Sequence, residues 1–221
     1  MRVFVITAFV SISVLVLLGV SLTSIGKFNK IAGACGSDGL SDGITLNEKY
    51  GYFEGVKTEV PLVADTEGVN PVLGVNNEEK WVEVDLSDQK LRAWEGSSIF
   101  LETLVSTGLP WWPTPQGEFR VWAKIRATKM EGGEGKNYYN LPNVPFVMFF
   151  ENTEVPGRRG FGLHGTYWHN DFGRVRSHGC VNLPTNIAEQ LYYWTTPTLP
   201  EGKRFVRSSA DNPGTRVVIH E

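Results

Sequence analysis

The residues best suited to covalent chemistry in this 221-residue chain are one cysteine and two histidines. Cys180 follows His178 by two positions and His164 by sixteen, whereas the second cysteine, Cys35, has no histidine near it in the sequence. A free thiol has a pKa of about 8.5, so it is nucleophilic near neutral pH only where a base or cation favours the thiolate. Residues two apart on an extended segment project to the same side, and the loop after His164 allows that histidine to return to Cys180. The set predicts nucleophilic catalysis by Cys180.

These residues belong to a longer motif. His164 and Gly165 are followed, after a polar loop, by the run Ser177-His178-Gly179-Cys180-Val181-Asn182. This pattern resembles the signature of the L,D-transpeptidase catalytic domain, also called the YkuD domain. The resemblance covers roughly residues 80–219 and includes the segments 81–86, 106–108, 114–117 and 143–146. Asn182 stands where many members of the family carry arginine.

The resemblance implies a reaction. Cys180 attacks a peptidoglycan stem tetrapeptide after its third residue, His164 moves the protons, and the backbone carbonyl of Gly165 orients His164. The terminal D-alanine leaves, and the side-chain amine of a neighbouring stem accepts the acyl group, giving a 3→3 cross-link. The family resemblance also implies that carbapenem β-lactams inhibit the enzyme covalently. We expect no cofactor and no metal.

The other motif residues have supporting roles. We expect His178 to act electrostatically and the backbone N–H groups near Gly179 and Cys180 to hold the oxyanion. Ser177 is expected to fix the strand end by hydrogen bonding, and Asn182 completes the motif. Glycine at 165 suits either a close backbone approach or a turn.

Aromatic residues gather in the predicted loops. As a group they are expected to line a groove for an extended peptide or glycan, and each alone is equally consistent with packing under a lid. The members are Trp111, Trp112, Tyr138, Tyr139, Tyr167 and Trp168. Tyr167 and Trp168, closest to His164, are the candidate substrate-binding residues.

Two other interpretations of Cys180 remain. A buried cysteine is often an inert small hydrophobe. A zinc site is the second alternative, because His164, His169 and His178 are also ligand types, although the spacing typical of structural zinc sites is absent. His169, in a polar loop, is expected to be solvated.

The elements that position these residues begin at Lys80. Alternating apolar and polar residues predict short strands at 82–86, 89–94, 99–106, 119–126, 144–150, 160–164, 204–207 and 216–219, with a glycine-rich loop at 128–143. Ile187, Leu191 and Trp194 at i, i+4 and i+7 predict one helix over about 185–194. The sequence therefore predicts a mainly β domain over 80–221, sandwich-like or barrel-like, with one main helix. Sixteen basic and fifteen acidic residues nearly cancel there, which argues against a nucleic-acid partner.

Residues 31–79 differ in composition, with nine acidic residues and two lysines. Low hydrophobicity and net negative charge predict an acidic flexible tether. The alternative is that the apolar patches at 50–53 and 60–63 dock as edge strands on the catalytic domain. We expect no disulfide between Cys35 and Cys180, because it would block the nucleophile.

The N-terminus is predicted to reach the membrane. No charge lies between Arg2 and Lys27, and the apolar run is long enough to span a bilayer, which predicts a signal anchor within 1–30. A cleaved signal peptide is the alternative, because Ala32-Gly33-Ala34 fits a cleavage pattern. Either way the remainder is expected to be extracytoplasmic, in the cell envelope, as a membrane-anchored or secreted enzyme. A carboxypeptidase that hydrolyses the same donor and a non-catalytic wall-binding module are the alternative functions.

Overall fold

The computed structural model describes residues 47–61 and 78–221. The predicted signal anchor, Cys35 and most of the predicted tether lie outside these residues. Within the described part, no helix combines the length and the apolar character needed to cross a membrane.

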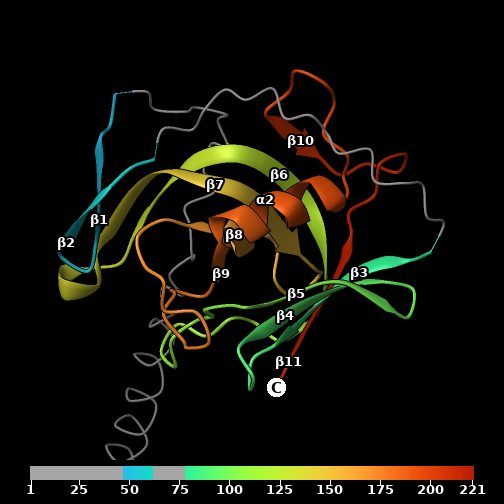
Figure 1. Cartoon of the computed structure of the whole chain (residues 1–221), viewed down its shortest axis with the longest axis horizontal. Helices are drawn as coiled ribbons and strands as arrows, with labels where there is room; N and C mark the ends of the chain where they lie inside the picture. Colours follow the sequence, from blue (N-terminus) through green and yellow to red (C-terminus); the bar gives the residue numbers. More distant parts are fainter. Residues whose placement is uncertain (1–46, 62–77) are drawn as a thin grey trace, which may run out of the picture. The chain divides into compact units, whose positions relative to one another are not determined.

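The described residues form eleven strands, one α-helix and two short 3₁₀ helices (Figure 1). The strands are β1 (Tyr50–Phe53), β2 (Val56–Glu59), β3 (Lys80–Asp85), β4 (Lys90–Glu95), β5 (Ser98–Leu104), β6 (Gly117–Gly132), β7 (Tyr139–Glu151), β8 (Gly162–Thr166), β9 (Val181–Pro184), β10 (Phe205–Arg207) and β11 (Arg216–His220). The helices are η1 (Gly135–Asn137), η2 (Gly157–Arg159) and α2 (Thr185–Trp194). A mainly β domain with one main helix is thus confirmed for the part of the chain that is described.

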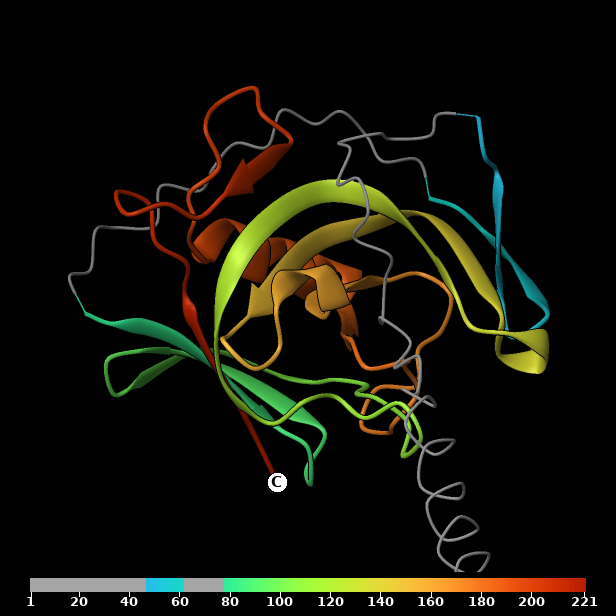
Figure 2. The same ribbon diagram turned by 180° about the vertical axis from the view of Figure 1, so that it is seen from behind.

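One strongly curved sheet contains all eleven strands. Its main path runs β2-β1-β7-β6-β11-β3-β4-β5, with β10 beside β6, β8 beside β7, and β9 beside β8. Most pairs are antiparallel, but β11 pairs with β3 and β8 pairs with β9 in parallel. Seen from both sides, β6 and β7 arch together over α2 (Figures 1 and 2).

The expected barrel-like closure is wrong, because the sheet does not close. After β5, the backbone N–H of Thr107 donates to Gln89 Oε1 at 2.9 Å and that of Gly108 to Thr114 Oγ1 at 2.9 Å. The chain after β5 thus bonds to Gln89 and Thr114, and β5 does not pair with β2, the strand at the other end of the path. Two isolated bridges, Ser106 with Asn182 and Gly108 with Ser177, join this segment to the region of β9 in place of a strand pair.

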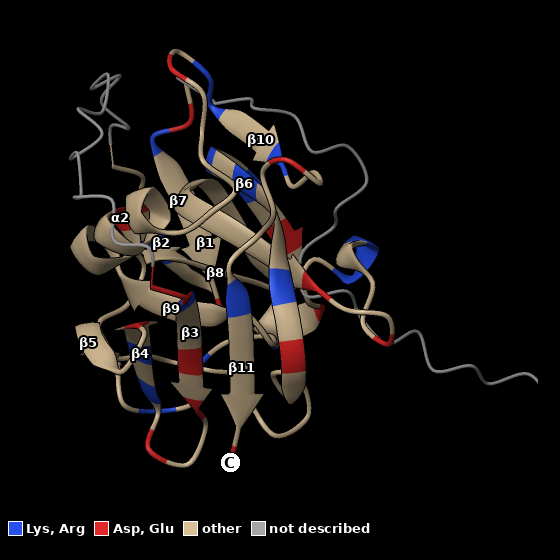
Figure 3. Cartoon of the chain, turned by 90° about the vertical axis from the view of Figure 1, so that its right-hand side faces the viewer, with Lys and Arg blue, Asp and Glu red and all other residues tan. Residues whose placement is uncertain are grey.

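Side-chain alternation explains which face of the sheet is buried. On β3 and β4, Val82, Val84, Leu91 and Ala93 face the core, and the residues between them are polar. Positions of Lys and Arg and positions of Asp and Glu occur together along β3, β4 and β11 (Figure 3). One example is Arg92 Nε, 2.7 Å from Glu102 Oε2. The period of two residues along a strand therefore separates the core from the solvent face.

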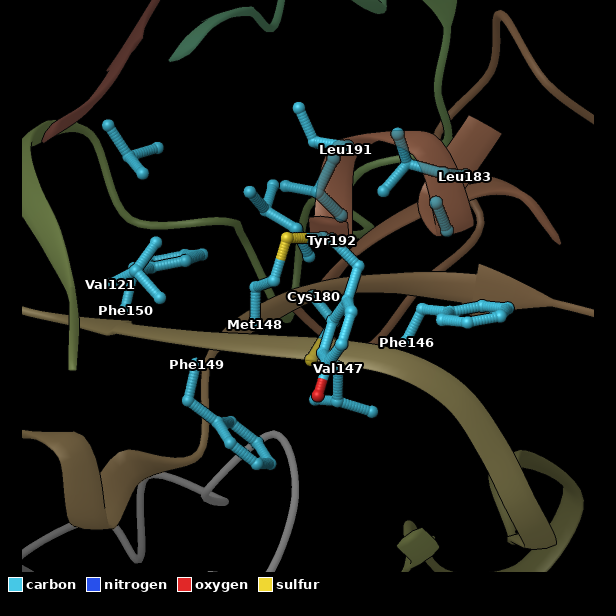
Figure 4. Close-up of a cluster of buried hydrophobic side chains, with 14 of the residues drawn as sticks. Val121, Phe146, Val147, Met148, Phe149, Phe150, Cys180, Leu183, Leu191 and Tyr192 are labelled. Carbon is cyan, nitrogen blue, oxygen red and sulfur yellow. The ribbon is translucent and has the colours of Figure 1, made fainter. Parts of the chain in front are cut away.

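The core beside the motif lies between β7 and α2. Helix α2 buries Ala188, Leu191, Tyr192 and Trp194. Of the predicted inner face, Leu191 and Trp194 are buried, whereas Ile187 is only partly buried. Figure 4 shows Cys180 among the buried side chains of β7, β9 and α2. The cysteine is therefore part of a packed interior and does not lie on a surface loop.

Two sequence expectations fail here. The predicted glycine-rich loop at 128–143 is mostly strand, because β6 runs to Gly132 and β7 begins at Tyr139, with Gly132 directly opposite Tyr139. Residues 50–59, assigned to the tether, form a β1–β2 hairpin, and β1 pairs with β7 through Tyr52 and Phe53. For the 50–53 patch, docking as a strand is therefore the interpretation that holds.

Candidate active site

Parallel pairing of β8 with β9 brings the two halves of the motif together. His164 lies opposite Asn182 in this pair, and opposite residues project to the same face of a sheet. Cys180 is two residues before Asn182, at the point where β9 begins. His164 on β8 and Cys180 in the turn just before β9 both line one cavity.

The cavity is small and mainly apolar. It is lined by Phe53, Met130, Tyr139, Leu141, His164, Trp168, Ser177, His178, Cys180 and Asn182. The cysteine is 4% exposed, and its thiol donates to the carbonyl of Gly160 with Sγ and oxygen 3.6 Å apart. A thiol so placed meets only molecules that enter the cavity.

His164 is held in one orientation by the backbone of the next residue. Its side chain is 2% exposed, and Nδ1 lies 3.1 Å from the carbonyl oxygen of Gly165. A neutral imidazole that donates from Nδ1 has Nε2 available as a proton acceptor. This is the contact that the family resemblance implies for Gly165, and it suits His164 to act as a base.

Glycine is required at 165 by close packing. A Cβ there would lie 2.9 Å from Pro145 Cγ and 3.3 Å from Thr185 Cα. Of the two reasons left open by the sequence, close backbone approach is the one that the structure supports.

Ser177 and Gly179 shape the turn that presents Cys180. Ser177 Oγ donates to the carbonyl of Cys180 and accepts the N–H of Gly179 at 3.0 Å. Gly179 has a φ of +115°, and a Cβ on it would meet the ring of Phe161 at 2.6 Å. The segment 178–180 is therefore a turn and not the extended strand expected, and Ser177 fixes it as predicted. The Gly179 N–H, one of the two predicted oxyanion donors, is already bonded to Ser177.

His178 lies inside a group of aromatic rings. Its ring centroid is 4.3 Å from that of Trp112, 4.9 Å from that of Tyr139 and 6.5 Å from that of Phe53. Burial lowers the pKa of His178, and this is opposed by the charge of Glu54, a hydrogen bond to the backbone of Asn137 and the charge of Cys180. Its Nε2 is buried without a hydrogen-bond partner among the described residues. The lowered pKa disfavours the charged form of His178, so the electrostatic role expected for it stays a prediction.

His169 is half-buried and hydrogen-bonded, contrary to the expectation of a solvated side chain. Its Nε2 lies 2.8 Å from Nδ2 of Asn182, its Nδ1 accepts the N–H of Asp171, and burial lowers its pKa to about 4. It holds the side chain of Asn182 against the cavity. In the described ranges, no group of three or more His, Cys, Asp or Glu is arranged to hold a metal ion.

Of the two candidate substrate-binding residues, only one lines the cavity. Trp168 lines the cavity, with its ring 5.8 Å from that of His164. Tyr167 does not line it, because its hydroxyl donates to the carbonyl of Pro142 at 2.6 Å and ties the loop to β7. Among the other loop aromatics, Trp111 is 63% exposed, whereas Tyr139 lies within β7 and is buried.

Sequence reasoning missed three lining residues: Phe53, Met130 and Leu141. The last two lie in the segment interpreted as a loop, where glycines obscured the alternation, as does Tyr139, which was expected to line the groove from a loop. A signal for Phe53 existed, because Glu54-Gly55 separates two short runs with strand character, and a two-residue linker ending in glycine is typical of a hairpin.

Several solved structures are similar to this chain. An L,D-transpeptidase from Mycobacterium smegmatis is 20% identical, with a TM-score of 0.52 over 65% of this chain and 59% of that chain. L,D-transpeptidase 3 from Mycobacterium tuberculosis, solved with a faropenem-derived adduct, is 19% identical, with a TM-score of 0.50 over 65% and 61%. An Enterococcus faecium L,D-transpeptidase mutant is 27% identical, with a TM-score of 0.48 over 65% and 50%. The match thus spans about half to three fifths of the length of these proteins.

No curated protein matches the chain. The family model for the L,D-transpeptidase catalytic domain, YkuD, matches residues 79–219, which is more than half of the sequence. This match, together with the fold shared with the mycobacterial enzymes, confirms the resemblance drawn from the motif. The chain belongs to the YkuD family of L,D-transpeptidase catalytic domains.

Proposed function

We propose that this protein is an extracytoplasmic cysteine acyltransferase that forms 3→3 cross-links in peptidoglycan. The observation that carries the proposal is the presence of Cys180 and His164 in one cavity, with His164 Nδ1 bound to the Gly165 carbonyl. That arrangement leaves Nε2 of His164 to exchange protons with the thiol. Membership of the family supplies the class of substrate.

The first half of the reaction makes a thioester. His164 Nε2 accepts the Cys180 proton, and the thiolate attacks the carbonyl carbon of the third residue of a stem tetrapeptide, forming a C–S bond and an oxyanion. The backbone N–H of Cys180 is the proposed oxyanion donor, because that of Gly179 already bonds Ser177. The C–N bond then breaks, and the imidazolium of His164 gives its proton to the amine of the departing D-alanine.

The second half transfers the acyl group. The side-chain amine of a neighbouring stem attacks the thioester, loses a proton to His164 and forms the new amide as the C–S bond breaks. The proton returns to the Cys180 thiolate, so each residue ends as it began. Water in place of the amine would give a carboxypeptidase, which is the second candidate within the same mechanism.

We also propose that carbapenem β-lactams acylate Cys180. Relatives have been solved with imipenem and with a faropenem-derived adduct. A strained four-membered amide presents an electrophilic carbonyl to the same thiolate. The predicted membrane attachment through residues 1–30 remains part of the proposal.

The test is incubation of the full chain with muropeptides that contain tetrapeptide stems, followed by mass spectrometry of the products. Cross-linked dimers with released D-alanine support transpeptidation, and tripeptide monomers support the carboxypeptidase. No product from the wild type, with the Cys180→Ala variant as the matched blank, would favour a wall-binding module and refute an enzyme acting on this donor.

A further inference from the structure

The β1–β2 hairpin lies outside the segment matched by the family model, yet it packs beside the catalytic cavity. The matched segment begins at residue 79, whereas the hairpin ends at Glu59. In the β1–β7 pair, Tyr52 is opposite Asn140 and Phe53 is opposite Tyr139, and the N–H of Glu54 donates to the carbonyl of Tyr138 at 3.1 Å. These backbone bonds place the tip of the hairpin next to cavity-lining Tyr139.

Phe53 forms one wall of the cavity. Its side chain is 6% exposed, and it lines the same space as Cys180. The ring centroid lies 6.1 Å from that of Trp168, and 6.5 Å from that of His178, to which it stands edge-on at 88°. The guanidinium of Arg176 lies 5.3 Å from the same ring. Phe53 thus lies beside Trp168 in the loop after His164 and beside Arg176 and His178 at the start of the nucleophile's turn.

Glu54 connects the hairpin to the turn that carries the nucleophile. Its Oε2 lies 2.9 Å from Nη1 of Arg176, the residue before Ser177. The backbone N–H of Arg176 in turn donates to the carbonyl of Thr107 at 2.9 Å. Glu54 is thus joined to the residue that precedes the Ser177–Cys180 turn by an ion pair, and Nε of the same Arg176 lies 3.3 Å from Oδ2 of Asp171.

The backbone of Glu54 indicates that its side chain is needed. Phe53 pairs with Val56, so Glu54 and Gly55 form a two-residue turn, with φ values of +50° and +80°. Asparagine or glycine suits the first of these positions, and glutamate is strained there. A residue kept in a strained conformation beside an active site points to a role for its carboxylate.

We propose that the hairpin is part of the active site: Phe53 is a specificity-determining wall of the cysteine cavity, and the Glu54–Arg176 ion pair is a positioning contact that holds it there. The ten lining residues include no Asp, Glu, Lys or Arg. The section of the acyl donor that lies against Phe53 is therefore uncharged. The identity of that donor rests on the proposed function, but the wall itself does not.

The test uses the full chain and two reagents for Cys180. Imipenem reports binding followed by acylation, and iodoacetamide reports only access to the thiol. Acylation is followed by intact-protein mass spectrometry with peptide mapping, over a range of imipenem concentrations. The wild type is compared with Phe53→Ala, Phe53→Leu, Glu54→Asn and the control Tyr52→Ala, whose side chain is 46% exposed on the same strand.

For Phe53→Ala we expect the half-saturating imipenem concentration to rise about tenfold, since losing one hydrophobic contact in a pocket typically costs about 10–200-fold in discrimination. The limiting acylation rate should stay within about threefold, because Phe53 takes no part in proton transfer. Alkylation by iodoacetamide should become faster as the cavity opens. Phe53→Leu should restore most of the affinity for imipenem, and Tyr52→Ala should match the wild type.

Glu54→Asn removes the carboxylate while giving the turn a better residue. We expect a rise of about two- to fivefold in the half-saturating concentration, the size typical of a partly exposed ion pair. In an Arg176→Gln background, Glu54→Asn should not raise the half-saturating imipenem concentration any further. A further rise as large as the one seen in the wild-type background would refute the positioning role of the ion pair.

The role of Phe53 as a specificity-determining wall is refuted if Phe53→Ala and Tyr52→Ala have the same half-saturating imipenem concentration. If imipenem fails to acylate even the wild type, the proposed function is in doubt, and the role of Phe53 is then tested with iodoacetamide alone. Faster alkylation of Cys180 in Phe53→Ala than in Tyr52→Ala supports Phe53 as a wall of the cavity, and equal rates refute it.

Discussion

Lys124 makes the stability of this protein depend on pH in a direction that can be worked out from the structure. It lies in β6, is 1% exposed, and donates from Nζ to the carbonyl of Thr195 at 2.7 Å. Its Nζ also lies 4.6 Å from the ring centroid of Tyr192. No carboxylate forms an ion pair with it among the described residues, and burial lowers its pKa to about 7.

The sign follows from the protons bound in each state. Between about pH 7 and 10.5 the unfolded chain holds a proton on Lys124 that the folded chain lacks, so the free energy of unfolding rises with pH across this window. Well below pH 7, Lys124 is protonated in both the folded and the unfolded chain, so the free-energy cost of burying its charge no longer changes with pH. Integrating from pH 7 to 9.5 gives a gain of roughly 3 kcal/mol for the wild type. The hydrogen bond to Thr195 is worth about 1 kcal/mol and does not alter this slope.

The perturbation is Lys124→Met, which keeps the length of the side chain and removes the titrating group. Urea unfolding of wild type and variant at several pH values between 6.5 and 9.5 measures the difference in free energy. Lys129→Met is the matched control, because Lys129 is on the same strand, 43% exposed, and its hydrogen bond to Glu131 raises its pKa out of the window. Parallel profiles for wild type and Lys124→Met would refute the reasoning. A difference in the free energy of unfolding that shifts in favour of Lys124→Met as the pH is lowered from 9.5 to 6.5 supports it.

Four further predictions concern the site. Cys180→Ala should abolish acyl transfer, and Cys35→Ala should leave it intact; loss of activity in the Cys35 variant while Cys180 is still alkylated would contradict the assignment. His164→Ala should reduce the steady-state rate at pH 7 by about 10²–10⁴-fold and His178→Ala by less, since only His164 is assigned proton transfer; the reverse order would exchange their roles. Carbapenem acylation should be stoichiometric at Cys180, persist in a chelator and leave Cys35 unmodified, as shown by peptide mapping; an adduct on Cys180→Ser at another residue would count against it. Gly165→Ala should lower the rate by about tenfold or more, because its Cβ displaces the carbonyl that orients His164, and unchanged kinetics would show that this hydrogen bond is dispensable.

Several features of this protein follow from the sequence by itself. The i, i+4, i+7 spacing of apolar residues predicts the helix over 185–194, and α2 occupies Thr185–Trp194, because this spacing is a local property. The strands at 82–86 and 89–94 were likewise visible, since each alternates between one buried and one solvated face. The motif that contains His164 and Cys180 identified the family for the same reason, because chemistry of this kind needs particular residue types at a particular spacing.

Tertiary structure decided what surrounds the motif. Residues 128–143 have too many glycines to alternate clearly, and they become strand because β6 and β7 satisfy each other's backbone groups, Met130 opposite Leu141 and Gly132 opposite Tyr139. His169 was expected in water, but its loop folds over Asn182, and a contact between residues thirteen apart has no signature in local composition.

The hairpin is the clearest case. An acidic segment with few apolar residues cannot bury enough surface to fold alone, so composition predicts a tether for residues 31–79. Phe53 finds its burial against Trp168 and His178, more than a hundred residues later, and β1 finds its backbone partners on β7. Sequence patterns report what a segment can bury by itself, whereas the surface supplied by the rest of the fold determines whether such a segment becomes part of the active site.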